Sequence, residues 1–274
     1  MKTSTEINSI AKLVGMEKAV YLVAEAGFDA YDFSMFQMTN KDHPLAGDNY
    51  LAFARKIKQI GLDNGIACNQ SHAPFPVYFD WIRELQPRAI ECTAEVGGKI
   101  CVIHPDNNKS PEENAEMYFE LLPMAKDYGV ILAAENMWNW DEKANIALPA
   151  ACSSPESFVR HIDAVNDPFL IACLDIGHAE MEGQNTSAPE MIRALGHRLG
   201  ALHIHDNDQH FDSHAIPFSM KIDFDAVVAA LKEVGYKGDL TLEADQHCGH
   251  FTPETVHVAV KELAEAAKRL KAMF

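Results

Sequence analysis

Short apolar runs alternate with longer segments of helical period about eight times along the chain, and this alternation limits the folds that it can adopt. A first strand is expected near residues 3–10. The apolar runs that predict the later strands occupy residues 28–35, 66–74, 99–106, 130–137, 169–178, 201–208 and 238–245. The segments that predict helices occupy residues 16–27, 49–65, 81–98, 111–129, 154–167, 188–200, 223–236 and 252–274.

Strands and helices that alternate in this way predict a parallel sheet covered by helices. Several helical segments end at a glycine, such as Gly27, which suits the left-handed position that follows many helices. A (β/α)8 TIM barrel, formed as a single domain by residues 1–274, accounts for the pattern most economically. An open doubly wound sheet is the alternative, but no GxGxxG motif follows the first strand.

Composition narrows the range of partners. The formal net charge of −17 disfavours two kinds of partner. Nucleic acid is bound mainly through Lys and Arg, and an anionic membrane would repel so acidic a surface. No apolar run reaches the roughly 18 residues of a membrane span, and the polar N-terminus lacks a signal-peptide pattern. The six cysteines form no CxxC pair, as is usual for reduced thiols. We therefore expect a cytoplasmic protein that binds a small molecule.

Most of the expected strands end in a side chain that can bind a metal or move a proton. These side chains are His72, His104, Glu135, Asp175, His205 and Glu243. In a TIM barrel the carboxyl ends of the strands meet on one face, where active sites of this fold are built. Carboxylates crowded in a partly buried site repel one another, and a divalent cation relieves that repulsion. Two Glu, one Asp and one His suit Mn²⁺ or Mg²⁺, with Co²⁺ or Zn²⁺ as alternatives.

The stretch LHIHDND, residues 202–208, offers two histidines to this site. Alternation along a strand places His203 and His205 on the same face, with Leu202 and Ile204 opposite. Periodicity alone does not decide which of the two histidines would bind a metal.

The strand ends IHPD, AEN, LDIGH, HIHDND and LEAD resemble those of the xylose isomerase-like TIM-barrel superfamily. Within it, the chain is most similar to the sugar-phosphate isomerase/epimerase proteins, which are related to ketose 3-epimerases and to endonuclease IV. The most specific stretches are Asp175-x-x-His178, residues 203–208 and the strand that ends at Glu243. The resemblance covers the chain from about Gly15 onward.

This resemblance implies one divalent metal ion, Mn²⁺ before the others, held by Glu135, Asp175, His205 and Glu243. It implies a metal-dependent isomerase or epimerase that acts on a small sugar or polyol-derived ketone through a cis-enediolate. Glu135 and Glu243 are the expected catalytic base and acid, in either order. The residues expected to contact the substrate are His72, His104, His178, Trp138, His203, Asp212 and His214.

Two departures from the family pattern bear on specificity. Phe211 stands where ketose 3-epimerases of the tagatose type carry an arginine, and the loop near Pro217 has diverged. No Gly-rich cradle or Arg cluster for a phosphate is visible, which favours an unphosphorylated substrate. Members of this superfamily often pair, so a homo-oligomer is expected.

Alternative functions stay open at this level. An inosose-type dehydratase would begin with the same proton abstraction, and a binding protein without turnover would keep the pocket. An endonuclease IV-like zinc phosphodiesterase is the rival from another class, because this chain also has residues of the types that hold three zinc ions there. These are His72, His104, Glu135, Asp175, His178, His205, Asp212, His214 and Glu243. The acidic net charge disfavours that rival, since a phosphate backbone needs cationic contacts.

Overall fold

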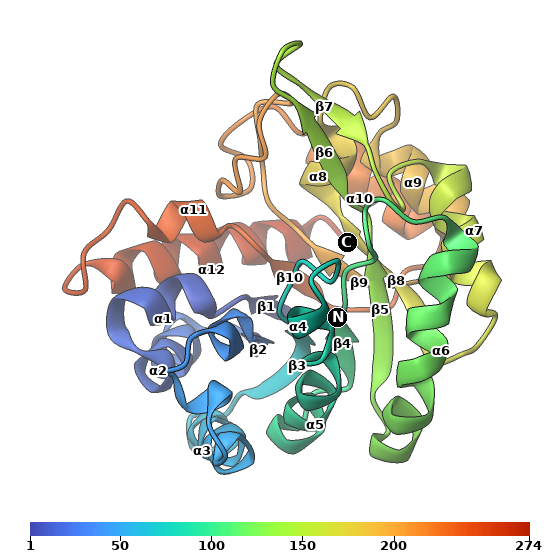
Figure 1. Ribbon diagram of the computed structural model, residues 1–274. Coiled ribbons are helices and arrows are strands. Elements are labelled where there is room, and N and C mark those ends of the chain that lie inside the picture. The colour runs from blue at the N-terminus through green and yellow to red at the C-terminus, as the bar shows by residue number, and fades with distance from the viewer.

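Eight parallel strands form a closed ring at the centre of the computed structural model, which describes residues 1–274 (Figure 1). The longest run of paired strands is β2 (Ala30–Ser34), β3 (Ala67–His72), β4 (Ile100–Val102), β5 (Ile131–Glu135), β8 (Leu170–Asp175) and β9 (Leu199–His203). The strands β1 (Thr3–Thr5) and β10 (Leu240–Leu242) pair with each other. Parallel bridges from Glu6 to Asp32 and from Ile204 to Leu242 join this pair to both edges of the run. The ring is therefore closed, and the predicted (β/α)8 barrel is confirmed.

Helices surround the ring (Figure 1). The longer ones are α2 (Met16–Ala26), α3 (Tyr50–Asp63), α5 (Gln86–Val96), α6 (Pro111–Tyr128), α7 (Pro155–Val165), α9 (Ala188–Leu195), α10 (Phe224–Glu233) and α12 (Val256–Ala272). Short helices α1 (Asn8–Val14), α4 (Asp80–Arg83), α8 (Ile176–Glu180) and α11 (Asp245–Cys248) follow strands β1, β3, β8 and β10. None of the helices combines the length and the apolar character that crossing a membrane requires.

Local sequence signals explain where many of these helices begin and end. Helix α2 ends at Gly27, whose φ of 88° is left-handed, as the sequence predicts. Helix α6 begins with a capping box, in which the Ser110 hydroxyl accepts a hydrogen bond from the Glu113 amide and the Glu113 carboxylate accepts one from the Ser110 amide. Helices α7 and α9 likewise begin after a serine that caps the first turn, followed by proline.

The structure differs from the predicted elements in several places. The strands expected over residues 169–178 and 201–208 end at Asp175 and His203, because Asp175 caps helix α8 and the chain after His203 leaves the strand. The strand expected over residues 3–10 ends at Thr5, because the Glu6 carboxylate accepts hydrogen bonds from the amides of Asn8 and Ser9 and so starts helix α1. The helix expected over residues 81–98 is divided into α4 and α5, and a proline lies in the first turn of α5. The segment after Glu135 forms an unpredicted antiparallel hairpin, β6 (Trp138–Asp141) and β7 (Ile146–Pro149), which projects beyond the end of the barrel (Figure 1).

The apolar core lies mainly between the ring and the helices, where a cluster of 68 buried residues joins them. A separate small cluster is formed by side chains from neighbouring strands, namely Val102, Ala133, Cys173 and Ala201. All six cysteines are buried and unpaired, as the sequence predicts. The framework is therefore well packed, and most of the candidate ligands at its carboxyl end lie on strands or within two residues of them, whereas Asp212 and His214 lie on the loop between β9 and α10.

Candidate active site

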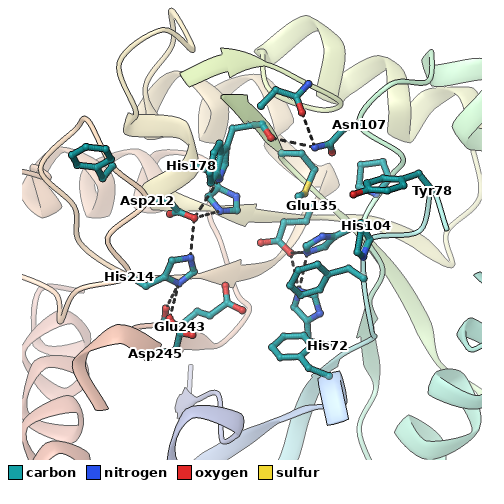
Figure 2. A pocket seen from close by; sticks show the side chains of 18 of the residues that line it. His72, Tyr78, His104, Asn107, Glu135, His178, Asp212, His214, Glu243 and Asp245 are labelled. Carbon is teal, nitrogen blue, oxygen red and sulfur yellow. Dashed lines mark hydrogen bonds and ion pairs between the residues drawn. The ribbon is translucent and has the colours of Figure 1, made fainter. Parts of the chain in front are cut away.

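The carboxyl ends of the strands surround a cavity of about 680 Å³ (Figure 2). His72, Glu135, Asp175 and His203 are the last residues of β3, β5, β8 and β9. The other predicted site residues at the strand ends, His104, His205 and Glu243, follow β4, β9 and β10 within two residues, and all seven side chains are buried. The convergence expected from the barrel is thus present. The roles of these residues in metal binding and catalysis stay predictions.

Glu135 and Glu243 both approach the same ring nitrogen of His203. The Nδ1 atom of His203 is 2.9 Å from Oε1 of Glu135 and 3.2 Å from Oε2 of Glu243. Burial acts to raise the pKa of Glu135, but the charges of His203 and His104 outweigh it and hold that pKa well below its usual range. Burial and the charge of Glu135 raise the pKa of Glu243 against the opposing effect of His203. The two carboxyl groups are therefore close, coupled and unequal.

His72 and His104 form a group with the second oxygen of Glu135. Glu135 Oε2 lies 3.3 Å from His72 Nε2 and 3.1 Å from His104 Nε2. The Nδ1–H of His72 donates to the Ala73 carbonyl at 2.8 Å, which in the neutral ring leaves a lone pair on Nε2. Burial lowers the pKa of His104 to about 4, so this ring is neutral near pH 7. Burial acts to lower the pKa of His72, but the hydrogen bond and charge of Glu135 outweigh it and raise that pKa. The Nε2 atoms of the two histidines lie 2.9 Å apart, so either a proton or a cation can stabilise this group.

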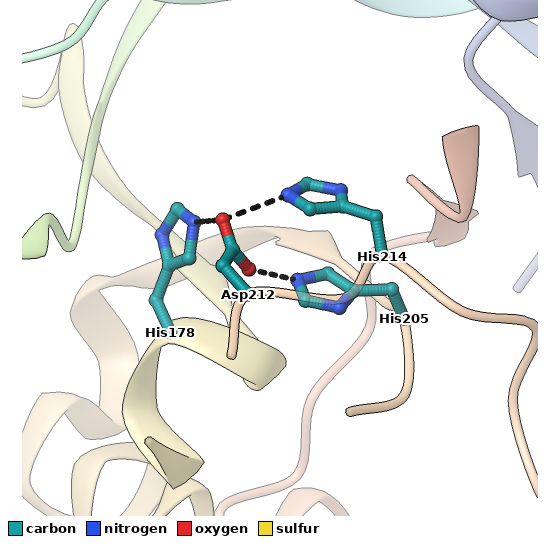
Figure 3. Close-up of side chains that lie close together, drawn as sticks. All are labelled: His178, His205, Asp212 and His214. Carbon is teal, nitrogen blue, oxygen red and sulfur yellow. Dashed lines mark hydrogen bonds and ion pairs between the residues drawn. The ribbon is translucent and has the colours of Figure 1, made fainter. Parts of the chain in front are cut away.

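A second group surrounds Asp212 (Figure 3). Asp212 Oδ2 is 3.2 Å from His178 Nε2 and 3.1 Å from His214 Nε2, while Oδ1 is 3.4 Å from His205 Nε2. The Nδ1 atoms of His178 and His214 donate to the carbonyls of Asn136 and Glu243. A histidine that binds a metal usually directs its other ring nitrogen to such a partner.

Protonation is the other way to stabilise this second group. Burial acts to lower the pKa of His178, but the charges of Asp175 and Asp212 outweigh it and raise the pKa to about 10. The pKa of His214 is likewise raised well above its usual range, because the effect of Asp212 exceeds that of burial. The group therefore holds either protons or a cation.

The two histidines of the HIHDND stretch lie in different parts of the site. His203 belongs to a group with Glu135, Asp175 and Glu243 whose possible ligand atoms lie within 4.8 Å of one another. His205 approaches Asp175, with Nε2 at 3.0 Å from Oδ1, and it also stacks on His214 with ring centroids 4.0 Å apart. The prediction that His205 rather than His203 is the metal ligand is not decided by this geometry.

The stretch DIGH, residues 175–178, is explained by this packing. Asp175 caps helix α8 by accepting a hydrogen bond from the His178 amide at 2.7 Å. A Cβ atom on Gly177 would lie 1.9 Å from Cε1 of His205, so only glycine leaves room for that ring. The same short segment therefore places an aspartate, a histidine and the space for a second histidine.

Sequence reasoning missed several residues that organise the site. Asn136 holds the backbone of Asp175 through two hydrogen bonds and also accepts from His178 through its carbonyl. Asp206 is fully buried and accepts hydrogen bonds from the amides of Met220 and Ile222, which ties down the loop that carries Asp212. Both residues lie in the AEN and HIHDND stretches, directly after residues of metal-ligand type.

The hairpin β6–β7 contributes Trp138 to the cavity. Its indole Nε1–H donates to Asp212 Oδ2 at 3.3 Å, and Trp140 stacks on Phe211 with ring centroids 5.6 Å apart. Trp138, Phe211 and Phe75 line the cavity, whereas the lining contains no Lys or Arg. The site is therefore rich in carboxylates, imidazoles and aromatic rings, and it offers no Lys or Arg for a phosphate.

A closed eight-stranded barrel with acidic and imidazole side chains at the carboxyl ends of its strands defines a TIM-barrel protein with a site in the position usual for enzymes of this fold. Residues 20–273 match the family described as xylose isomerase-like TIM barrel, and the chain belongs to that family.

Relatives with similar sequences are of two kinds. The chain is 29% identical over 278 residues to the uncharacterized protein MJ1311 of Methanocaldococcus jannaschii, a match that covers 89% of each chain. It is 26% identical over 238 residues to the L-ribulose 3-epimerase of Methylomonas sp., covering 84% of this chain and 78% of that protein.

Solved structures share the fold across almost the whole chain. A D-tagatose 3-epimerase-like protein superposes with a TM-score of 0.71 at 22% identity, covering 99% of both chains. D-allulose 3-epimerase from Methylomonas sp. superposes with a TM-score of 0.73 at 16% identity, covering 100% of this chain and 98% of that one.

Proposed function

We propose that this protein is a divalent-metal-dependent epimerase or isomerase of a small, uncharged keto sugar or polyol-derived ketone. The observation that carries the proposal is the buried pair Glu135 and Glu243, both within 3.2 Å of His203 Nδ1 at the inner end of a cavity without Lys or Arg. The similarity to an L-ribulose 3-epimerase and to ketose 3-epimerase structures supports the same class of reaction.

The donor set suits a divalent cation. Glu135 Oε2 and Asp175 Oδ2 are buried oxygens that accept no hydrogen bond, which is costly unless a cation or proton compensates them. The family resemblance assigns the ion to Glu135, Asp175, His205 and Glu243, and His203 lies close enough to several of these to share it. Carboxylate oxygens with one imidazole favour Mn²⁺ or Mg²⁺, with Co²⁺ and Zn²⁺ as alternatives. When bound, the ion would polarise the substrate carbonyl and stabilise negative charge on its oxygen.

The glutamates would carry out the proton transfers. One carboxylate removes the proton from the carbon beside the carbonyl, and the electron pair of that C–H bond forms the C=C bond of a cis-enediolate as the carbonyl electrons move to oxygen. The other carboxyl group returns a proton to the opposite face of the same carbon, which gives the epimer. Removal of a proton from C1 of the ketose instead, with return of a proton to the former carbonyl carbon C2, gives the aldose.

The remaining polar side chains would orient the substrate. His72, His104 and His178 present ring nitrogens to the cavity, and Trp138 forms part of its wall. The catalytic groups are buried and the cavity is enclosed by the strand ends, so bulk water has limited access to an enediolate. The side chains that would hold a ketose are therefore imidazoles, which donate or accept hydrogen bonds, and aromatic rings.

Solvent exchange tests the proposal directly. The protein is incubated with Mn²⁺ and a panel of ketoses in D₂O, and incorporation of deuterium beside the carbonyl is followed by NMR. We expect Glu135→Gln and Glu243→Gln to slow exchange by about 10²–10⁴-fold, the usual contribution of general acid–base catalysis. Glu25→Gln, at an exposed position of α2, is the matched control. Exchange that is unaffected in both site variants contradicts the mechanism. A dehydrated product would instead identify the protein as a dehydratase.

A specific observation favours a second candidate, a zinc-dependent phosphodiesterase. His72, His104 and Glu135 form one group of possible ligands, Glu135, Asp175, His203 and Glu243 form another, and His178, His205, Asp212 and His214 form a third. The metal content of the purified protein, measured by elemental mass spectrometry, separates the candidates. One ion per chain supports the epimerase, whereas about three zinc ions with cleavage of abasic DNA would establish the phosphodiesterase. The absence of Lys and Arg from the cavity lining favours the first outcome.

A further inference from the structure

The wall of the cavity changes character between its inner and outer parts. The inner part consists of the histidines and carboxylates described above. The outer part carries aromatic rings, among which Phe75, Tyr78 and Phe211 are 43%, 51% and 51% exposed. In Figure 2, Tyr78 and Asn107 lie across the pocket from Glu243 and Asp245. The proposed chemistry uses only the inner part, so the outer aromatic wall is left without a role.

Neutral amides accompany these rings. Asn107, Asn139 and Gln246 line the same cavity. The Nδ2 of Asn107 donates to the Trp138 carbonyl at 3.1 Å and to Asn139 Oδ1 at 3.2 Å, which holds the two amides beside the indole ring. Aromatic faces pack against the C–H groups of a sugar ring, and amides both donate to and accept from hydroxyl groups. The outer wall thus combines the contacts that suit a neutral, hydroxylated ring.

The cavity is larger than a single sugar requires. Its volume is about 680 Å³. Even at about 30 Å³ per non-hydrogen atom, the volume that one molecule occupies in liquid water, a hexose would fill only about half of it. A cavity of this size is typical of sites for ligands larger than a monosaccharide.

Two of the outer rings are held by neighbours. The ring of Phe75 stacks on His104 with centroids 4.5 Å apart, and Phe211 stacks on Trp140 with centroids 5.6 Å apart. Rings that are already placed lose little conformational entropy when a ligand binds. The outer wall is therefore a formed surface, although its rings are exposed.

We infer that the outer wall is a subsite for a second sugar ring, and that the substrate is a keto sugar in glycosidic linkage rather than a free monosaccharide. This inference rests on the proposed function, since it takes the inner site to bind the keto sugar. The absence of Lys and Arg from the lining argues that the second unit is uncharged.

Isothermal titration of the Mn²⁺-loaded protein tests the inference with matched ligands. D-fructose is compared with isomaltulose and lactulose, in which fructose carries a second sugar on O6 or O4 and keeps the atoms beside the carbonyl free. We expect at least one of the disaccharides to bind about tenfold more tightly than D-fructose, from stacking and the added buried area. Tyr78→Ala and Phe211→Ala should each reduce this ratio of affinities by about threefold or more. Trp81→Ala is the control, because Trp81 is 54% exposed near Tyr78 but does not line the cavity.

The outcomes separate this inference from the function on which it rests. If D-fructose binds and exchanges deuterium but neither disaccharide binds more tightly, the outer subsite is refuted and the epimerase proposal stands. If the ratio falls equally in Trp81→Ala, the outer wall is not the cause, and the inference is also refuted. If no ketose of either size binds or exchanges, both proposals fail.

Discussion

Replacing Gly177 with alanine tests whether the position of His205 matters. The added Cβ would lie 1.9 Å from Cε1 and 2.4 Å from Nε2 of His205, so the ring must move by about 1.5 Å to reach an ordinary contact of 3.4 Å. His214 stacks on the ring at a centroid distance of 4.0 Å, which leaves little room for this movement. We expect the crowding to cost about 1–3 kcal/mol in the free energy of unfolding.

The displacement should also affect turnover. His205 Nε2 would leave its 3.0 Å contact with Asp175, and a misplacement of about 1 Å in an active site can cost about 10²-fold in rate. Urea unfolding and the deuterium-exchange assay measure the two effects. Gly47→Ala is the control, because its nearest Cβ contact would be an ordinary 3.7 Å and its φ of −84° suits alanine. A Gly177→Ala protein with unchanged stability and turnover would refute the role assigned to this packing.

Other perturbations follow from the same structure. Burial and a neighbouring aspartate raise the pKa of Glu6 from 4.5 to about 7. Ionisation of Glu6 therefore destabilises the folded state. The gain in the free energy of unfolding from Glu6→Gln, measured in urea, should be absent below about pH 4.5 and should grow to the order of 3 kcal/mol as the pH rises through 7. Ser110→Ala should lower the free energy of unfolding by about 1 kcal/mol, and Ser110→Thr by less, because the capping bond with Glu113 is lost only in the former. Mn²⁺ at about 100 times its Kd should raise the free energy of unfolding of chelator-treated protein by about 2.7 kcal/mol. If His205 is the ligand, His205→Gln should reduce this stabilisation by Mn²⁺ more than His203→Gln does. Equal effects of the two variants would argue that both histidines share the ion.

Much of the fold could be predicted because its signals are local in the sequence. These signals are the spacing of apolar residues in strands and helices, the glycines that follow helices and the serines that cap them. The elements that escaped prediction depend on contacts that the periods do not encode. The first strand stops short because Glu6 bonds to the amides that follow it. The four residues of β6, WNWD, alternate aromatic and polar side chains, but so short a run does not by itself predict a strand. The hairpin packs against the segment after helix α8, where a Cβ on Gly183 would lie 2.0 Å from the Ala147 carbonyl oxygen.

The convergence of the site could also be predicted, since it needs only the barrel and the final residue of each strand. The partner of each histidine could not. His203 is the last residue of β9 and His205 lies two residues beyond it, a spacing of about 6.6 Å along an extended chain. His203 Nδ1 lies 2.9 Å from Glu135 Oε1, whereas His205 Nε2 lies 3.0 Å from Asp175 Oδ1. The two side chains therefore reach different carboxylates, and the course of the loop that returns Asp212 decides which.

Protons and a divalent cation are alternative ways to stabilise the carboxylates of this site. Against the effect of burial, Asp175 and Asp212 raise the pKa of His178 to about 10. The Nε2 atom that would carry the proton is also the one directed at Asp212 and the candidate cation position. His214 is in the same situation, because its Nδ1 is committed to a backbone carbonyl. Binding of a cation by these nitrogens must displace their protons, so the affinity for a metal would fall as the solution is acidified. A neutral keto sugar adds no charge to this balance, whereas a phosphate would have to compete with the carboxylates for the same cations.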